Sequence, residues 1–399
     1  MSHQTDSSIL TSEQFDPTKG KKLASFSFGI SALGVLVSAV GLFKSPEQFA
    51  FSWLFGFFVV FAISVGALFW TILHHATDSE WSVLVRRQLE NMASVIPMLG
   101  VLFLPLPLFC APILWKWWNL APGVDPLLDA KAAYLNHPFF FARYLAYFVG
   151  LGGVALVLRN RSIAQDYDGS STHTHVMRTA SIAGLPILGV CLTFAAVDWL
   201  MGLDYHWFST MWGVYIFAGA LGSSMALLVL VVTALRRSGY LGPVSKEHYH
   251  VMGKFMLAFT VFWAYIGYSQ YMLIWYANIP EETIYFKIRN TESWHLLSTA
   301  LVVGRFFVPF AFLLFQSTKK NIRVICGVAA WMLVMEILDM YVIVLPSLHQ
   351  TGVSPSIYDL AALAAVGGSA AGLYFRRLIS SNVFPSRDPR LAASLNLHN

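Results

Sequence analysis

The sequence predicts an all-α integral membrane protein with ten transmembrane helices, arranged as two parallel-repeat four-helix bundles plus two peripheral helices. Of its 399 residues, 56% are hydrophobic and only 12% are charged, and the mean hydropathy is +0.60. These values lie far from the averages of soluble domains. Apolar runs long enough to cross a bilayer recur along the chain, and basic residues gather in alternate loops. Together these observations exclude a soluble enzyme.

The apolar runs, taken in order, define the predicted elements. They cover residues 23–43, 49–73, 92–115, 138–158, 179–201, 207–235, 251–277, 296–316, 322–346 and 356–375. Each reaches the roughly 20 residues that a spanning helix needs. The predicted organisation is an N-terminal tail 1–22, a peripheral first helix 23–48, a first bundle 49–206, a second bundle 207–346, a peripheral tenth helix 347–379 and a C-terminal tail 380–399.

Charge predicts the orientation of the chain. An even number of spans places both termini on one side, and 19 of the 26 Lys and Arg residues fall on that side. The positive-inside rule then predicts that both termini are cytoplasmic. The pI near 9.0 follows from this bias, so a nucleic-acid partner is not expected. No short apolar segment with a cleavage site precedes the first span, so we expect an uncleaved N-terminus.

Cysteine and histidine placement argues against a redox centre in this chain. Cys110, Cys191 and Cys326 each lie alone in an apolar segment, so neither a disulfide framework, a c-type haem attachment nor a cysteine-ligated cluster is encoded. The 12 histidines all fall in predicted loops or at span ends, whereas a haem-binding bundle needs facing histidines within spans. No cofactor is therefore expected to be bound by this chain itself.

Two short matches predict an internal duplication of the second to fifth spans in the sixth to ninth. ARYLAYF at 142–148 parallels GRFFVPF at 304–310, and AVDWLM around Asp198 parallels ILDMYV around Asp339. Four crossings separate the matched spans, so both sets have the same orientation. The sequence thus favours two like-oriented four-helix bundles.

The depths of the charged residues along their spans predict that an arginine pairs with an acid in each bundle. At 1.5 Å per residue, Arg143 lies about 8 Å below the outer surface and Asp198 about 7 Å below it, so the two can meet. In the second bundle, Arg305 and Glu336 lie about 14 and 15 Å deep. Asp339 is one turn further out on the same helix face as Glu336.

Two interpretations of these groups stay open. In the structural one, ion pairs offset the cost of burying charge and fix the helix register. In the functional interpretation, the two negative charges of Glu336 and Asp339 exceed the one positive charge of Arg305. One carboxylate then takes up and releases a proton.

Other titratable residues extend the functional interpretation towards both membrane surfaces. The candidate residues of the outer half are Arg143, Asp198, Asp204, His206, Arg305, Glu336 and Asp339. Those of the inner half are His74, His75, Asp78, Glu80 and Lys254. About 20 Å of mostly apolar helix separates Glu336 from the cytoplasm, so the sequence does not define a continuous path.

The composition of two segments on the predicted cytoplasmic side indicates their structure. Residues 74–91 are expected to form a short interfacial helix with Trp81 and Val85 on one face. The polar residues from Ser380 onwards are expected to be poorly ordered.

Three longer strings carry a family resemblance that covers nearly the whole chain. They are KAAYLNHPFFFARY at 131–144, FAAVDWLMGLDYHWFSTMWGVYIFAG at 194–219 and FTVFWAYIGYSQYMLIWYANIPEET at 259–283. With them the chain resembles the ActF-type membrane subunit of alternative complex III, a bacterial quinol:cytochrome c or high-potential acceptor oxidoreductase. The wider group is that of the NrfD-like, or polysulfide-reductase-like, membrane subunits.

The resemblance implies a setting for the chain. It implies a bacterial inner membrane, an ActC-type paralogue, an iron–sulfur subunit, multihaem cytochrome c subunits and small membrane subunits as partners. The complex would carry haem c, iron–sulfur clusters and quinone, whereas this chain would hold only structural lipids. In that family the quinol site is generally assigned to the ActC-type paralogue, and ActF-type subunits are proposed to contribute a transmembrane proton path.

Three functions from different classes therefore remain. The chain is expected to be a redox-inactive subunit with a proton path, a purely structural membrane anchor, or an independent secondary transporter. Transport is disfavoured because the predicted repeats are parallel and no pair of Gly/Pro-broken helices marks a midplane site.

Overall fold

The computed structural model describes residues 13–398, apart from the side chain of Glu292. Most of these residues are helical, and within this range the chain contains no β-strand. Among these described residues, ten helices are long and apolar enough to cross a membrane. The predicted all-α, multi-pass membrane fold is therefore confirmed, while the first 12 residues of the predicted N-terminal tail lie outside the described range.

Ten spans and several short helices make up the fold. The spans are α1 (Pro17–Lys44), α2 (Pro46–Ala76), α3, α4, η2 and α5 together (Val83–Leu114), α7 (His137–Asp168), α8 (Ser171–Trp199), α9 (Trp212–Arg237), α10 (Lys246–Ala277), α12, η5 and α13 together (Glu292–Leu313), α15 (Ile322–Val344) and α16 (Ile357–Ile379). The short helices are η3 (Lys116–Asn119), α6 (Pro126–Lys131), η4 (Met201–Leu203), α11 (Pro280–Ile288), α14 (Gln316–Lys320), η6 (Leu345–Ser347) and α17 (Leu391–Leu395).

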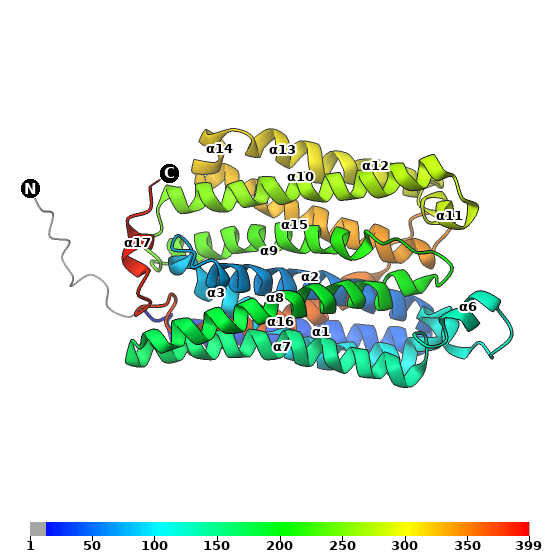
Figure 1. The fold of residues 1–399 in the computed structure, drawn as a ribbon, viewed down its shortest axis with the longest axis horizontal. Helices are drawn as coiled ribbons and strands as arrows, with labels where there is room; N and C mark the ends of the chain where they lie inside the picture. The colour runs from blue at the N-terminus through cyan, green and yellow to red at the C-terminus, as the bar shows by residue number, and fades with distance from the viewer. Residues whose placement is uncertain (1–12, 399) are drawn as a thin grey trace, which may run out of the picture.

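The long helices lie side by side, and the short ones collect at the two ends of the bundle (Figure 1). We call the end that carries α14 and α17 the terminal end, and the end that carries α6 and α11 the loop end. The first span begins at the terminal end with Pro17, six residues before its predicted start, because Asp16 caps the helix. The Asp16 carboxylate accepts hydrogen bonds from the amides of Thr18 and Lys19, as N-cap residues do.

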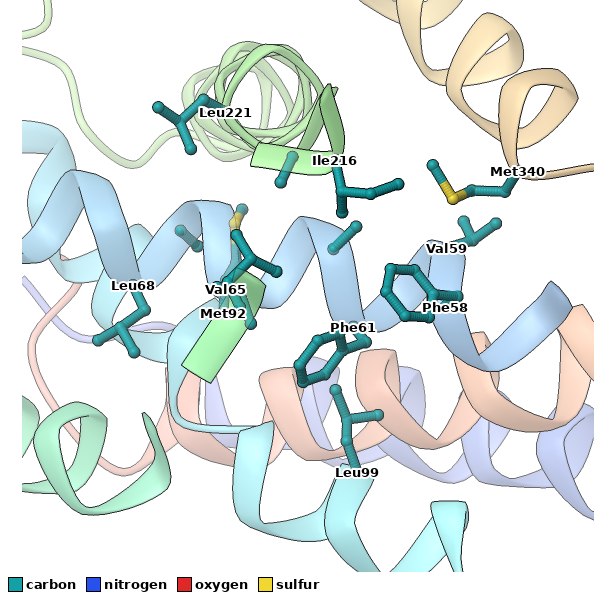
Figure 2. Close-up of a cluster of buried hydrophobic side chains, with 14 of the residues drawn as sticks. Phe58, Val59, Phe61, Val65, Leu68, Met92, Leu99, Ile216, Leu221 and Met340 are labelled. Atoms are coloured by element: carbon teal, nitrogen blue, oxygen red, sulfur yellow. The ribbon is translucent and has the colours of Figure 1, made fainter. Parts of the chain in front are cut away.

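Two spans, α2 and α9, form the centre of the molecule. In their most apolar stretches, 83% of α2 and 78% of α9 is buried. Figure 2 shows Ile216 and Leu221 of α9 on one side of α2 and Leu99 of α4 on another. The helix α2 also packs against α8 and α16, whereas α10 packs mainly against α9.

The first and tenth spans pack mainly against each other, at the side of α2. Their backbones come close at Gly34, where a Cβ atom would lie 2.5 Å from the amide nitrogen of Ala365. Small residues at such crossings are usual in membrane helices. The peripheral position predicted for the first and tenth helices and the internal duplication both stay predictions.

The interfacial helix predicted for residues 74–91 is wrong. Instead, α3 (Val83–Ala93) starts the third span nine residues earlier than predicted, and all its residues are buried. Arg86 and Arg87 are 0% exposed. Their burial is possible because carboxylates inside the protein pair with both guanidinium groups.

The predicted disorder of the C-terminal residues is also wrong for residues 380–398. Val383 and Phe384 are 0% and 2% exposed, and the amide of Val383 donates to the carbonyl of Glu13 at 2.8 Å. Asp388 lies against Arg86. A few apolar residues and one acid therefore dock a segment whose average composition is polar.

Two spans contain a π-helical turn that the sequence did not predict. The turns are η2 (Leu106–Cys110) and η5 (Val303–Phe307), and prolines lie in or next to both. Pro309 has no amide hydrogen for the carbonyl four residues before it, which favours the wider turn at Arg305. Such turns are often found at functional sites.

Candidate functional site

The acid–arginine group predicted in the second bundle is present, at the loop-end half of the spans. Arg305 donates through Nη1 to Asp339 Oδ2 and through Nη2 to Glu336 Oε2. The arginine is 7% exposed, and each acid is 1% exposed. One guanidinium thus faces two carboxylates in the interior of the protein. We call these three residues, with Tyr215 and Trp263, the Arg305 cluster.

The two acids of the Arg305 cluster have unequal surroundings. Asp339 also accepts hydrogen bonds from the Tyr215 hydroxyl at 2.7 Å and from the Trp263 indole at 3.1 Å. Glu336 has no such support, because its Oε1 atom is buried without a hydrogen-bond partner among the described residues. A buried acceptor of this kind is costly, so Glu336 is the acid that gains more from a proton.

A cap covers the loop end of this bundle. Arg289, just after α11, donates to the carbonyls of Val342 and Ile343 at 2.9 and 2.6 Å. Tyr285 of α11 stacks on Trp207 with ring centroids 4.3 Å apart, and burial raises the pKa of Tyr285 to about 12. The cap therefore closes the α15 end nearest to Asp339.

The pair predicted in the first bundle is also present, and it is fully matched. Arg143 Nε lies 2.8 Å from Asp198 Oδ2, and Nη2 lies 3.1 Å from Oδ1. The Tyr147 hydroxyl donates to Asp198 at 2.6 Å, and Arg143 Nη1 donates to the Tyr134 carbonyl at 2.8 Å. One acid against one bidentate arginine leaves no excess charge. This geometry favours the structural interpretation for the first bundle.

Asp204 and His206 lie on the surface at the loop end. The His206 ring lies 3.3 Å from Asp204 Oδ1 and 3.0 Å from Asp125 Oδ2. The Tyr205 hydroxyl donates to the same Asp125 oxygen at 2.7 Å. This bond from Tyr205 lowers the pKa of Asp125, and burial together with Asp125 raises the pKa of Tyr205 to about 12. The candidate residues predicted from the sequence did not include Asp125, which contacts both His206 and Tyr205.

The terminal end contains a second buried charge group, centred on Glu90. Arg86 Nε lies 3.3 Å from Glu90 Oε1, and Arg87 Nε lies 3.0 Å from Oε2. His75 Nε2 approaches Oε1 at 3.8 Å. Asp388 of the C-terminal segment completes the group through Arg86 Nη2 at 2.5 Å.

Sequence reasoning missed most of this terminal-end group. Of its members, only His75 was among the candidate residues. The signal that could have found it is the string RRQLEN, in which Arg86 and Arg87 precede Glu90 by four and three residues. That spacing places all three on one helix face.

The other residues predicted for the inner half of the proton path are His74, Asp78, Glu80 and Lys254, and they differ in burial. His74 is 1% exposed, has neither ring nitrogen bonded among the described residues, and lies edge-on to Trp81 at 5.1 Å. Asp78 pairs with Arg178 at 2.8 Å near the surface. Glu80 and Lys254 are exposed, so these two lie outside the buried group.

The structure thus gathers the predicted residues into separate groups rather than one continuous chain. Glu336 lies 14 residues from the start of α15 at Ile322, a distance of about 21 Å along the helix. Between these two residues α15 carries neither a carboxylate nor a histidine. A proton crossing this part would therefore need water or groups from neighbouring helices.

Within residues 13–398, no set of three or more His, Cys, Asp or Glu side chains is placed to hold a metal ion. Comparisons with known protein families and with curated proteins give no significant match to this chain.

Proposed function

We propose that this chain is a membrane subunit that binds and releases protons at the Arg305 cluster. The observation that carries the proposal is the excess of acid: two buried carboxylates share one guanidinium, and Glu336 Oε1 has no hydrogen-bond partner among the described residues. A second negative charge beside the first is disfavoured in a low-dielectric interior. Ionisable residues within spans are commonly part of ion or proton pathways.

The wider setting of the proposal follows from the sequence resemblance. The chain would be the ActF-type subunit of a quinol-oxidising complex in a bacterial inner membrane, with both termini in the cytoplasm. Electron transfer would belong to its partners: the ActC-type paralogue, the iron–sulfur subunit and the multihaem cytochrome. What supports this setting is the three strings at 131–144, 194–219 and 259–283, together with the ten spans.

The proposed orientation gives the Glu90 group and the Arg305 cluster different roles. With the terminal end in the cytoplasm, the Glu90 group would lie near the entry side, and the Arg305 cluster would lie in the periplasmic half. His75, whose Nε2 lies 3.8 Å from Glu90 Oε1, would belong to the entry-side group. Proton release from Glu336 would then be directed outward, past the α11 cap.

A structural anchor is the second candidate function, and one observation favours it. The Arg143–Asp198 pair is bidentate and fully hydrogen-bonded, which is what a register-fixing pair requires. In this alternative the Arg305 cluster would also serve only to hold α15 against its neighbouring spans.

The assembled complex distinguishes the two functions. Glu336→Gln keeps the side-chain shape but removes the titratable group, so proton release per electron is expected to fall while the complex still assembles and oxidises quinol. Glu47→Gln, at an exposed position in the first turn of α2, is the matched control. If proton release is unchanged in Glu336→Gln and only thermal stability falls, the anchor function is correct.

A further inference from the structure

An apolar groove of about 550 Å³ runs along the outside of α2. The spans α9 and α16 both pack on α2 and form the two walls of this groove, while α1 contributes to its mouth. Its volume falls in the range of roughly 300–1,000 Å³ that is usual for ligand sites. Its lining includes Leu23, Val60, Ser64, Leu227, Gly367 and Tyr374.

The groove is long and parallel to the helices. On the α9 side its lining extends from Leu227 to Ser238, the C-cap residue of that helix, and on α16 from Gly367 to Leu378. The first and last residues of each wall are eleven positions apart, which corresponds to about 16 Å along the helix axis. This is the shape of an extended hydrocarbon chain that enters from the membrane surface at the terminal end.

Two of its three polar side chains are bonded within the protein, and the third, Ser238, is exposed at the terminal end. The Ser64 hydroxyl donates to the Val60 carbonyl at 2.8 Å, and the Tyr374 hydroxyl donates to Gln88 Oε1 at 2.5 Å. The groove therefore suits an aliphatic chain better than a quinone ring, whose carbonyl oxygens need hydrogen-bond donors.

Basic residues lie at the mouth of the groove. Lys19 is one turn before Leu23 on the same face of α1, and Arg237 is three residues after the lining residue Ala234 on α9. Both side chains are exposed. Lys and Arg at a membrane surface attract anionic lipid headgroups.

We propose that this groove binds an anionic glycerophospholipid, with one acyl chain along α2 and the phosphate beside Lys19 and Arg237. The inference is independent of proton transfer at the Arg305 cluster, because the lining of the groove contains no member of that cluster. It assigns a lipid of defined charge to one place in the fold.

The first test fills the groove in the full-length chain. A Cβ atom on Gly367 would lie 4.0 Å from Val60 Cγ2, so Gly367→Phe can be accommodated and places its ring in the groove. Gly29→Phe is the matched control, because nothing lies within 4 Å of a Cβ there. Native mass spectrometry with added dioleoylphosphatidylglycerol is expected to show at least a tenfold loss of affinity in Gly367→Phe and none in the control.

The second test examines the headgroup. Lys19→Ala and Arg237→Ala are each expected to lower the affinity for phosphatidylglycerol about fivefold, the factor that one basic side chain near an anionic surface contributes. Binding of dioleoylphosphatidylcholine should not change. Unaltered phosphatidylglycerol affinity in Gly367→Phe overturns the proposal. So does quinone, rather than phospholipid, being the molecule that Gly367→Phe displaces from the purified chain.

Discussion

Gly219 of α9 lies directly against the guanidinium group of Arg305. A Cβ atom at Gly219 would be 2.6 Å from Arg305 Nη2 and 3.3 Å from Glu336 Oε2, closer to the nitrogen than two such atoms can approach. The absence of a side chain on α9 therefore provides the space in which the arginine meets Glu336. A helix of the protein centre thus determines the geometry of the acid cluster.

Gly219→Ala is expected to disturb this contact and to lower stability by about 1–3 kcal/mol, as overpacking does. Gly222→Ala, one turn along the same helix, is the control, because a Cβ there would lie 3.6 Å from Met332 Cε, an ordinary contact. The control should be neutral or slightly stabilising. Thermal unfolding in detergent measures both variants, and equal effects would contradict the close approach.

The unequal surroundings of the two acids predict unequal effects of neutralising them. Asp339→Asn weakens bonds to Arg305, Tyr215 and Trp263, so we expect it to lower the unfolding temperature clearly. Glu336→Gln keeps an oxygen that can accept from Arg305 Nη2 and places its amide nitrogen at the position of Oε1, which has no partner among the described residues, so its effect should be smaller. If Glu336→Gln is the more destabilising of the two, Glu336 is a structural residue rather than the titrating one.

The Arg143–Asp198 pair predicts strong coupling between its two members. Asp198→Leu or Arg143→Met alone leaves an unpaired buried charge and is expected to cost roughly 3–5 kcal/mol. The double variant removes both charges and should cost much less than the sum of the single variants. Unfolding temperatures of the four proteins complete the cycle, and additive effects would show that the two groups do not depend on each other.

The sequence predicts the spans and the Arg–acid pairs well because both depend on local rules. Apolar length alone identifies ten spans, and the 1.5 Å rise places Arg143 near Asp198 and Arg305 near Glu336. These predictions need no knowledge of which helices are neighbours, since the cost of a charge in the membrane already requires a partner at equal depth.

What the sequence does not predict depends on contacts between distant segments. Asp388 is separated from Arg86 by 302 residues, so no local pattern shows that the C-terminal segment neutralises the third span. Without Asp388 as a known partner, the composition of residues 74–91 predicts an interfacial helix, and that of the last residues predicts disorder. The unequal hydrogen bonding of Glu336 and Asp339 could not be predicted for the same reason, because Tyr215 and Trp263 lie on other helices.

The docked C-terminal segment leads to a prediction with a defined pH dependence. Burial opposes the charge on Asp388, but Arg86 and Arg390 outweigh it and hold the pKa of Asp388 below its usual range. A carboxyl whose pKa is lower in the folded state stabilises fully above its unfolded pKa, about 3.9. That stabilisation is lost as the pH falls further towards the folded-state pKa.

Asp388→Asn should remove this contribution already at neutral pH and expose residues 383–395 to hydrogen exchange, because Arg86 is left buried without one of its two acids. The wild-type segment should stay protected from pH 7 to about pH 4 and lose protection only in stronger acid. Glu80→Gln, at an exposed position of the same end, controls for a general change of surface charge. Exchange in Asp388→Asn that matches the wild type at pH 7 would mean that Val383 and Phe384 hold the segment by apolar contact alone.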